Sequence, residues 1–422
     1  MPRLSLLVVL LLGACVRGLL YAVPSVHATL STRPELATSI SSFRRLEEGV
    51  FLFQSTGSPY AGDVYHQPPL LFALLYPVLQ VAPASLQYFI KCTVFITADL
   101  LLAMGFDRLC KANLKLEEDV ASRLRIRRSG SLKCPGFYCT DEPYSLASSV
   151  AMSTVGFTHL AVLYSLVFAS EGALAASMMC VAAGTYLSVY PFFLMVPIVL
   201  LLRSVKESSL KSIGIKCLVV FGVWLGLLFY LSWNLTGGWE FLEETYAWVA
   251  KYSDLTPNIG IFWYFFMEVF DRFIPYFLFV MHLHPVIYVV PIYLRLAHRP
   301  QAYACALIGI FSLFQAYPSF GDFGFFLSML ALHPKTIMTI ENRFVYVLGL
   351  GVATCMLPVM WFLWLFPASG NANFFYNQTL VYQIFNTQII TAFVGATMKR
   401  DKDVDKYRTS HLKERKAVDA RE

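Results

Sequence analysis

Long apolar runs recur along the whole chain, from residue 4 to residue 398, with short polar loops between them. They make the sequence 57% hydrophobic and only 14% charged, a balance outside the range of soluble domains. Lipid offers no partner to an unpaired backbone group, and a series of apolar helices satisfies every such group internally. The sequence therefore predicts an all-α polytopic membrane protein. Its net charge of +6 is spread over loops, so we expect no nucleic-acid partner.

Basic residues are concentrated in two segments. Residues 107–143 contain eight Lys or Arg, and residues 399–422 contain nine. Because positively charged loops stay in the cytosol, both segments are predicted to be cytosolic. The segments poor in Lys and Arg, about 23–84, 235–273 and 367–378, are then lumenal. Both termini are predicted to be cytosolic, with 399–422 as a disordered basic tail.

The orientation also limits the number of crossings. Two helices between residues 68 and 106 would place the basic loop in the lumen, so the Pro-rich stretch 68–84 is predicted to be interfacial or re-entrant. Residues 4–22 could be a cleaved signal peptide, but Arg17 favours a retained signal anchor. A single membrane domain, 1–398, then has about twelve spans, several shorter than the ~20 residues of a full crossing. The predicted spans are 4–22, 86–106, 135–152, 154–169, 171–188, 190–203, 213–233, 274–296, 301–316, 318–333, 344–366 and 379–398.

A polar turn leads directly into an aromatic run in the middle of the chain. Asp254, Pro257, Asn258 and Gly260 are followed by six aromatic residues within 262–270. Aromatic rings are common at the membrane–water interface, where they anchor helix ends. The same arrangement suits a binding site for an amphipathic molecule. The stretch alone leaves both interpretations open.

Three segments carry a family resemblance. Ser58-Pro-Tyr through Pro-Leu-Leu71, Asp254–Phe270 and Asn371-Ala-Asn-Phe-Phe-Tyr376 together resemble the U subunit of GPI transamidase (PIG-U). The first segment also resembles the GPI mannosyltransferase that adds the first mannose. The resemblance implies the fold of the integral-membrane GT-C glycosyltransferases and a place in the endoplasmic reticulum membrane. It implies partnership with the GPI glycolipid, with transamidase subunits K, T and S, and with the anchor-attachment subunit.

The two relatives imply different functions. A lumenal mannosyltransferase that uses dolichol-phosphate-mannose needs an acidic pair in its first large lumenal loop. Glu47 and Glu48 are adjacent, so on a helix they point about 100° apart and cannot chelate together. Asp63 with His66 is the best remaining acid–base pair, and its spacing is commonly structural. We therefore expect a non-catalytic transamidase subunit with no metal and no cofactor, which recognises the glycolipid; the alternative is the mannosyltransferase.

Several residues have side chains suited to binding a glycolipid or a phospholipid. Trp263 and Phe266 could stack on sugar faces or line acyl chains, beside Asp254 and Asn258. Asn371 and Asn373 offer neutral donors and acceptors, and in an extended loop both would point to the same side. Gly370-Asn371 is also a turn signal, which is the alternative role. Lys211 could meet a lipid phosphate or act as a positive-inside anchor.

Overall fold

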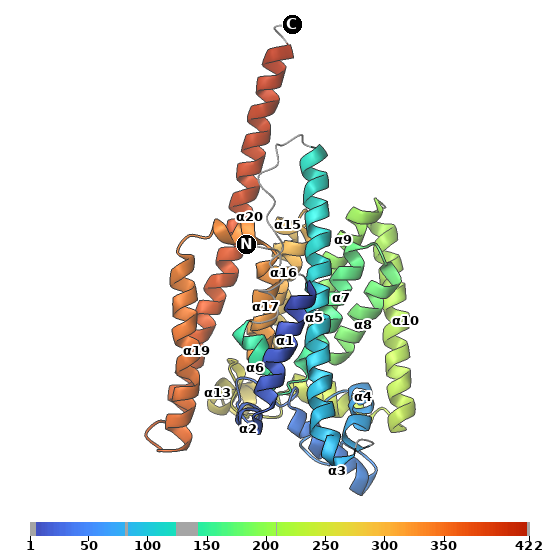
Figure 1. The fold of residues 1–422 in the computed structure, drawn as a ribbon, viewed down its shortest axis with the longest axis vertical. Coiled ribbons are helices and arrows are strands. Elements are labelled where there is room, and N and C mark those ends of the chain that lie inside the picture. The colour runs from blue at the N-terminus through green and yellow to red at the C-terminus, as the bar shows by residue number, and fades with distance from the viewer. Residues whose placement is uncertain (1–5, 81–82, 124–141, 208, 420–422) are drawn as a thin grey trace.

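The described part of the protein consists of helices and the loops between them. The computed structural model describes residues 6–80, 83–123, 142–207 and 209–419. Within these ranges the chain forms helices and no strand, which confirms the predicted all-α class (Figure 1). Four helical segments there are long and apolar enough to cross a membrane, and a fifth is the pair α1–α2, bent by 88°. The protein is therefore a helical membrane protein with several apolar spans.

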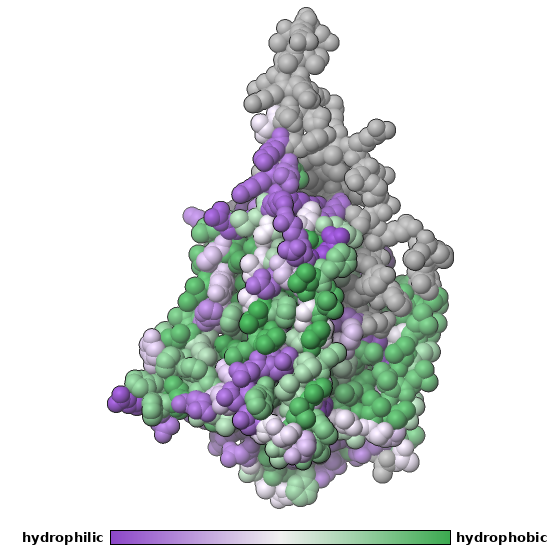
Figure 2. Space-filling view, turned by 90° about the vertical axis from the view of Figure 1, so that its left-hand side faces the viewer, coloured by the Kyte–Doolittle hydropathy of each residue, from purple (hydrophilic) through white to green (hydrophobic). Residues whose placement is uncertain are grey.

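The long helices form the outside of the bundle. Only 11–17% of the apolar windows in α10, in Asp271–Leu296 and in α19 is buried inside the protein, so these helices present apolar side chains outward. Figure 2 shows hydrophobic residues covering the middle of the α19–α20 face, with hydrophilic residues on the helix that projects beyond it. The elements that form the long segments are α1 (Leu6–Tyr21) with α2 (Pro24–Leu30), α5 (Ala84–Arg123), α10 (Leu210–Thr236), η3 (Asp271–Phe273) with α14 (Ile274–Ile287) and α15 (Val289–Leu296), α19 (Arg343–Leu365) and α20 (Ala372–Asp419).

Shorter apolar helices form the core. Every residue of α16 from Ala302 to Leu313 is buried. A Cβ on Gly309 would lie 2.8 Å from the Phe326 ring and 2.9 Å from Ile390, so α16 packs closely against both α17 and α20. These helices can be short because other helices cover them. They are α7 (Val155–Ser170), α8 (Leu174–Leu187), η1 (Tyr190–Leu194), α9 (Met195–Lys206), α16 (Pro300–Phe314) and α17 (Phe320–Ala331).

The segments predicted to be lumenal gather at one end. Helices α2, α3 and α4 lie there with α13 and the α19–α20 turn, whereas α20 projects from the opposite end (Figure 1). Helix α4 lies at this same end and does not cross the bundle, whereas α5, which follows it, runs the length of the bundle (Figure 1). The remaining elements are α3 (Phe43–Thr56), α4 (Pro69–Gln80), α11 (Glu240–Leu242), η2 (Glu243–Ala247), α12 (Trp248–Lys251), α13 (Phe262–Glu268) and α18 (Pro334–Met338).

One predicted span is too short to cross. In place of a helix over 135–152, α6 (Pro143–Val150) has eight residues. Glu142 caps its start by accepting hydrogen bonds from the backbone N–H groups of Tyr144 (3.2 Å) and Ser145 (2.7 Å). Just beyond the helix, Met152 has a positive φ of 55°. The helix is therefore limited by its cap at the start and by a residue with left-handed backbone conformation just after its end. Residues 135–141 lie outside the described ranges.

The predicted loop and tail are also more helical than expected. Helix α5 continues through 107–123, and α20 continues to Asp419, where the sequence predicts a disordered tail. Neither 107–123 nor 399–419 contains Gly or Pro, and both are rich in Lys, Arg and Glu, which favour helix. Lys399 also pairs with Glu341 at 2.7 Å. Helix propensity therefore overrides the high charge that suggested disorder.

A buried ion pair joins the first span to the bundle. Arg17 Nε donates to Asp99 Oδ2 at 2.5 Å, and the two side chains are 2% and 13% exposed. Arg17 also donates to the carbonyl of Gly13 at 3.1 Å. Charges inside a membrane helix are tolerated when they pair in the protein interior. Arg17 thus connects α1 to α5 within the apolar region.

The side of the membrane on which each end lies can be tested with cysteines. We expect Ser55→Cys and Asn371→Cys to react with an impermeant maleimide only after sealed microsomes are permeabilised, because both sites lie at the predicted lumenal end. Lys402→Cys should react without permeabilisation. Labelling of Ser55→Cys in intact vesicles would reverse the orientation.

Candidate functional site

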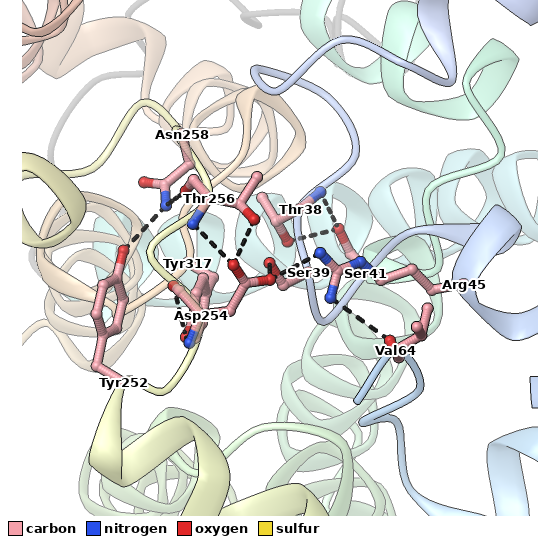
Figure 3. Close-up of polar contacts among 10 residues, drawn as sticks. All are labelled: Thr38, Ser39, Ser41, Arg45, Val64, Tyr252, Asp254, Thr256, Asn258 and Tyr317. Atoms are coloured by element: carbon pink, nitrogen blue, oxygen red, sulfur yellow. Dashed lines mark hydrogen bonds and ion pairs between the residues drawn. The ribbon is translucent and has the colours of Figure 1, made fainter. Parts of the chain in front are cut away.

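Asp254 connects segments that are far apart in the sequence (Figure 3). Its Oδ2 accepts hydrogen bonds from Ser39 Oγ at 2.6 Å and from Arg45 Nη2 at 2.7 Å. Its Oδ1 accepts from the backbone N–H of Thr256 at 2.8 Å. Burial raises the pKa of this carboxyl, but the bonds from Ser39 and Thr256 and the charge of Arg45 outweigh it and lower the pKa. Asp254 therefore carries a negative charge that links residues 39–45 to the turn before α13.

Asn258 shapes that turn from within. It is 2% exposed, and its Nδ2 donates to the Tyr252 hydroxyl at 3.0 Å. Its Oδ1 accepts from the backbone N–H of Gly260 at 2.7 Å. A Cβ on Gly260 would lie 2.7 Å from Pro318, so only glycine fits at this close approach. The structure places Asn258 in the framework of the site, with its amide engaged by the protein itself.

The aromatic run packs inward. Trp263 is 0% exposed and Phe266 is 5% exposed. The Trp263 ring meets Tyr376 edge-on at 5.7 Å and lies parallel to Trp364 at 6.4 Å. The run therefore fastens α13 to α19 and to the start of α20. Neither Trp263 nor Phe266 offers an open ring face in this arrangement.

Asn371 and Asn373 lie at the α19–α20 turn, and both are exposed. The extended loop predicted around them is wrong, because α20 begins at Ala372. Asn371 Oδ1 accepts from the Phe374 backbone N–H at 3.1 Å, as a helix N-cap does. Asn373 belongs to the first helical turn and Asn371 precedes it, so the alternation of an extended loop does not apply to this pair. Both side chains are accessible.

A polar hollow of about 810 Å³ opens beside Asp254. Arg44 is exposed in it, and Glu48 and Asp63 also line it. Glu47 points elsewhere, to Lys91 Nζ at 2.5 Å. The residues that line the hollow are Ser31, Thr32, Ser42, Arg44, Arg45, Glu48, Asp63, Val64, Trp248, Ser253, Asp254, Leu255 and Thr256. The set combines two guanidinium groups with three carboxylates and several hydroxyls, so it can bind a polar head group, and Arg44 is the cation in it that could meet a phosphate.

The pair Asp63 and His66 is not an acid–base pair in the structure. His66 is 2% exposed and lies flat on the Trp248 ring at 3.8 Å. Its Nδ1 lies 2.8 Å from the carbonyl oxygen of Glu244. His66 therefore holds the η2–α12 segment against the loop before α4. Among the described residues, no group of three or more His, Cys, Asp or Glu is placed to hold a metal ion.

A second opening was missed from the sequence. A cleft of about 90 Å³ lies on the other side of residues 38–42, with Thr38 and Ser41 in its wall. His159 and Asp322 line it, and their side chains approach to 3.4 Å. Each lies about one turn inside a predicted span. Because an ionisable residue inside a membrane span commonly marks a functional site, these two residues could have indicated the cleft from the sequence. Lys211 lines neither opening and is exposed in the first turn of α10.

Comparison with known proteins confirms the resemblance. A family model described as GPI transamidase subunit PIG-U matches residues 11–382. The chain is 29% identical to the human GPI-anchor transamidase component PIGU over 94% of each chain. It is 31% identical to GPI transamidase component GAB1 of Saccharomyces cerevisiae, over 90% of this chain and 91% of that protein. A homologue of GAB1 in Schizosaccharomyces pombe is 30% identical over 88% of each chain. The chain therefore belongs to the family of GPI transamidase subunit PIG-U.

Proposed function

We propose that this chain is a non-catalytic subunit of the GPI transamidase complex that holds the GPI glycolipid for attachment to precursor proteins. The observation that carries this proposal is the polar hollow beside Asp254, at the end where the predicted lumenal segments gather. A sugar–phosphate head group needs hydroxyl and cationic partners at the surface of a membrane. The relatives are named as transamidase components, which favours this function over the mannosyltransferase alternative.

The assembly follows from the same proposal. The chain lies in the endoplasmic reticulum membrane with about twelve spans, a GT-C-like fold and both termini in the cytosol. It works with subunits K, T and S and with the anchor-attachment subunit. The cysteine-protease-like subunit K performs the cleavage and transfer, while this chain presents the lipid.

Within the hollow, Arg44 is the proposed phosphate partner. It is exposed, in contrast to Arg45, which is paired with Asp254 at 2.7 Å. Asn371 and Asn373 are proposed to contact the glycan from the neighbouring α19–α20 turn. The proposed role of the other four residues is indirect: they fix the conformation of the 254–260 turn and the position of α13. These residues are Asp254, Asn258, Trp263 and Phe266. At the other end, Lys211 is proposed to meet a phospholipid phosphate, worth about 1 kcal/mol.

Removal of the Arg44 guanidinium tests the hollow. A hydrogen bond to a charged group is worth about 1.5–3 kcal/mol, so Arg44→Ala should weaken glycolipid binding about tenfold to a hundredfold. The readout is surface display of a GPI-anchored reporter, with assembly checked by co-precipitation. Arg272→Ala is the matched control, because Arg272 is an exposed arginine on η3 outside the hollow. Equal display in both variants would remove the hollow from the binding site.

The asparagines need a variant that keeps the helix cap. Asn371→Ala with Asn373→Ala removes two neutral contacts of about 0.5–1.5 kcal/mol each, a loss of about tenfold to a hundredfold in affinity. Asn371→Asp keeps the oxygen that caps α20 but loses the amide donors. Reduced reporter display in the double variant and in Asn371→Asp, with intact assembly, indicates glycan contact. Normal display in Asn371→Asp alone would mean that Asn371 only caps the helix.

The absence of a catalytic role is tested separately. Glu47→Ala, Glu48→Ala and Asp63→Ala should leave mannosylated GPI intermediates at normal levels, because none of these carboxylates transfers sugar. The measurement is radiolabelling of GPI lipids in cells that carry only the variant. Accumulation of unmannosylated glucosaminyl lipid in any of the three would contradict the proposal.

A further inference from the structure

The cleft around His159 has a polar part and an apolar part. Thr38, Ser41 and Asp322 line it near the helix ends of the predicted lumenal surface. Val162 of α7 and Ile308 of α16 line it six to seven residues farther from those ends, about 10 Å deeper at 1.5 Å per residue. A cleft that is hydroxyl-rich at one end and aliphatic at the other matches an amphiphile placed across the membrane surface.

The hydrogen bonds of Asp322 favour one tautomer of the His159 ring. Asp322 Oδ2 accepts from the Ser319 backbone N–H at 2.8 Å and from Ser319 Oγ at 2.7 Å, in the capping box of α17. A carboxylate that accepts these bonds also accepts from His159 Nε2, 3.4 Å from its Oδ1. The proton of the neutral imidazole is then on Nε2, and Nδ1 carries a lone pair.

That lone pair lies in a nearly buried ring. His159 is 9% exposed and stacks on Phe325 at 4.5 Å with an interplanar angle of 2°. Within the described residues, no hydrogen-bond partner of Nδ1 is found. Nδ1 is not among the fully buried side-chain atoms that lack a partner, so it keeps some accessible surface, and a bound group can donate a hydrogen bond to it. The complementary ligand atom is therefore a hydroxyl or an amide N–H.

We propose that this cleft binds the neutral, hydroxyl-bearing end of a membrane lipid, whose hydroxyl donates to His159 Nδ1 while a hydrocarbon chain runs along Val162 and Ile308. A phosphate in contact with the carboxylate of Asp322 is disfavoured, so an inositol lipid could bind only with its phosphate turned away from this side chain. The hydroxyl could belong to a glycerol or to an inositol ring, since both present the same donor. The site goes beyond the proposed function, because it is separate from the hollow and from the α19–α20 turn.

Photolabelling with paired lipids tests this site. The probes are a diacylglycerol with a diazirine in one acyl chain, its 3-O-methyl ether and a phosphatidylinositol with the same diazirine. The full-length chain is labelled together with the subunits that co-purify with it, and the modified peptides are identified by mass spectrometry. We expect saturable labelling of 155–170 and 300–314 by a hydroxyl-bearing probe. The methyl ether, which lacks the donor, should label about three- to tenfold less, the equivalent of one hydrogen bond.

Variants of His159 separate the acceptor from the packing. His159→Phe keeps an aromatic ring on Phe325 but removes Nδ1, so it should reduce labelling to the level of the methyl ether. His159→Gln retains an acceptor and should keep more labelling. Preferential labelling by the diacylglycerol or by the phosphatidylinositol identifies the source of the hydroxyl. The proposal is overturned if the methyl ether labels the unaltered protein as strongly as the diacylglycerol does, or if neither hydroxyl probe labels these two helices. Both measurements use the unaltered protein, so they do not depend on whether the His159 variants fold. They are also independent of the glycolipid function.

Discussion

The need to pair every backbone group in an apolar medium determines the layout of this protein. Helices that face outward, such as α10 and α19, are long enough to cross by themselves. Inner helices such as α16 are short because neighbouring helices, in place of lipid, surround them. Irregular backbone is concentrated at one end, where polar side chains supply its hydrogen bonds. The polar hollow and the cleft both form at that end, where the longest stretches of non-helical backbone among the described residues lie.

Charged residues within this layout act as connections between distant segments. Arg17 and Asp99 join α1 to α5 in the apolar region, and Arg45 and Asp254 join the start of α3 to the turn before α13. Loss of one partner of a buried pair costs about 3–5 kcal/mol, because the other charge stays buried. The more exposed pair at Asp254 is worth less, but Ser39 and Thr256 share its carboxylate. The position of the 254–260 turn therefore depends on several bonds to one side chain.

The sequence predicted the helices far better than the directions of single side chains. Apolar periodicity and proline placed α7, α10, α16 and α19 within a few residues, since burial in lipid or protein requires the same pattern. It failed at α6, where the cap at Glu142 and the φ of Met152 set the length. The aromatic run was correctly recognised as unusual, but the burial of Trp263 depends on α19 and α20, about one hundred residues away. Contacts over such separations cannot be deduced from local spacing.

Residues 38–42 form a common wall between the two openings. Ser39 binds Asp254 on the side of the hollow, while Thr38 and Ser41 line the cleft. The carbonyl of Ser41 accepts from the backbone N–H of Thr154 at 2.8 Å, which ties this wall to the start of the helix that carries His159. A head group in the hollow and a lipid in the cleft would therefore meet opposite faces of one short segment. Because that segment is held by hydrogen bonds at both faces, displacement by either ligand would have to break bonds that shape the other site.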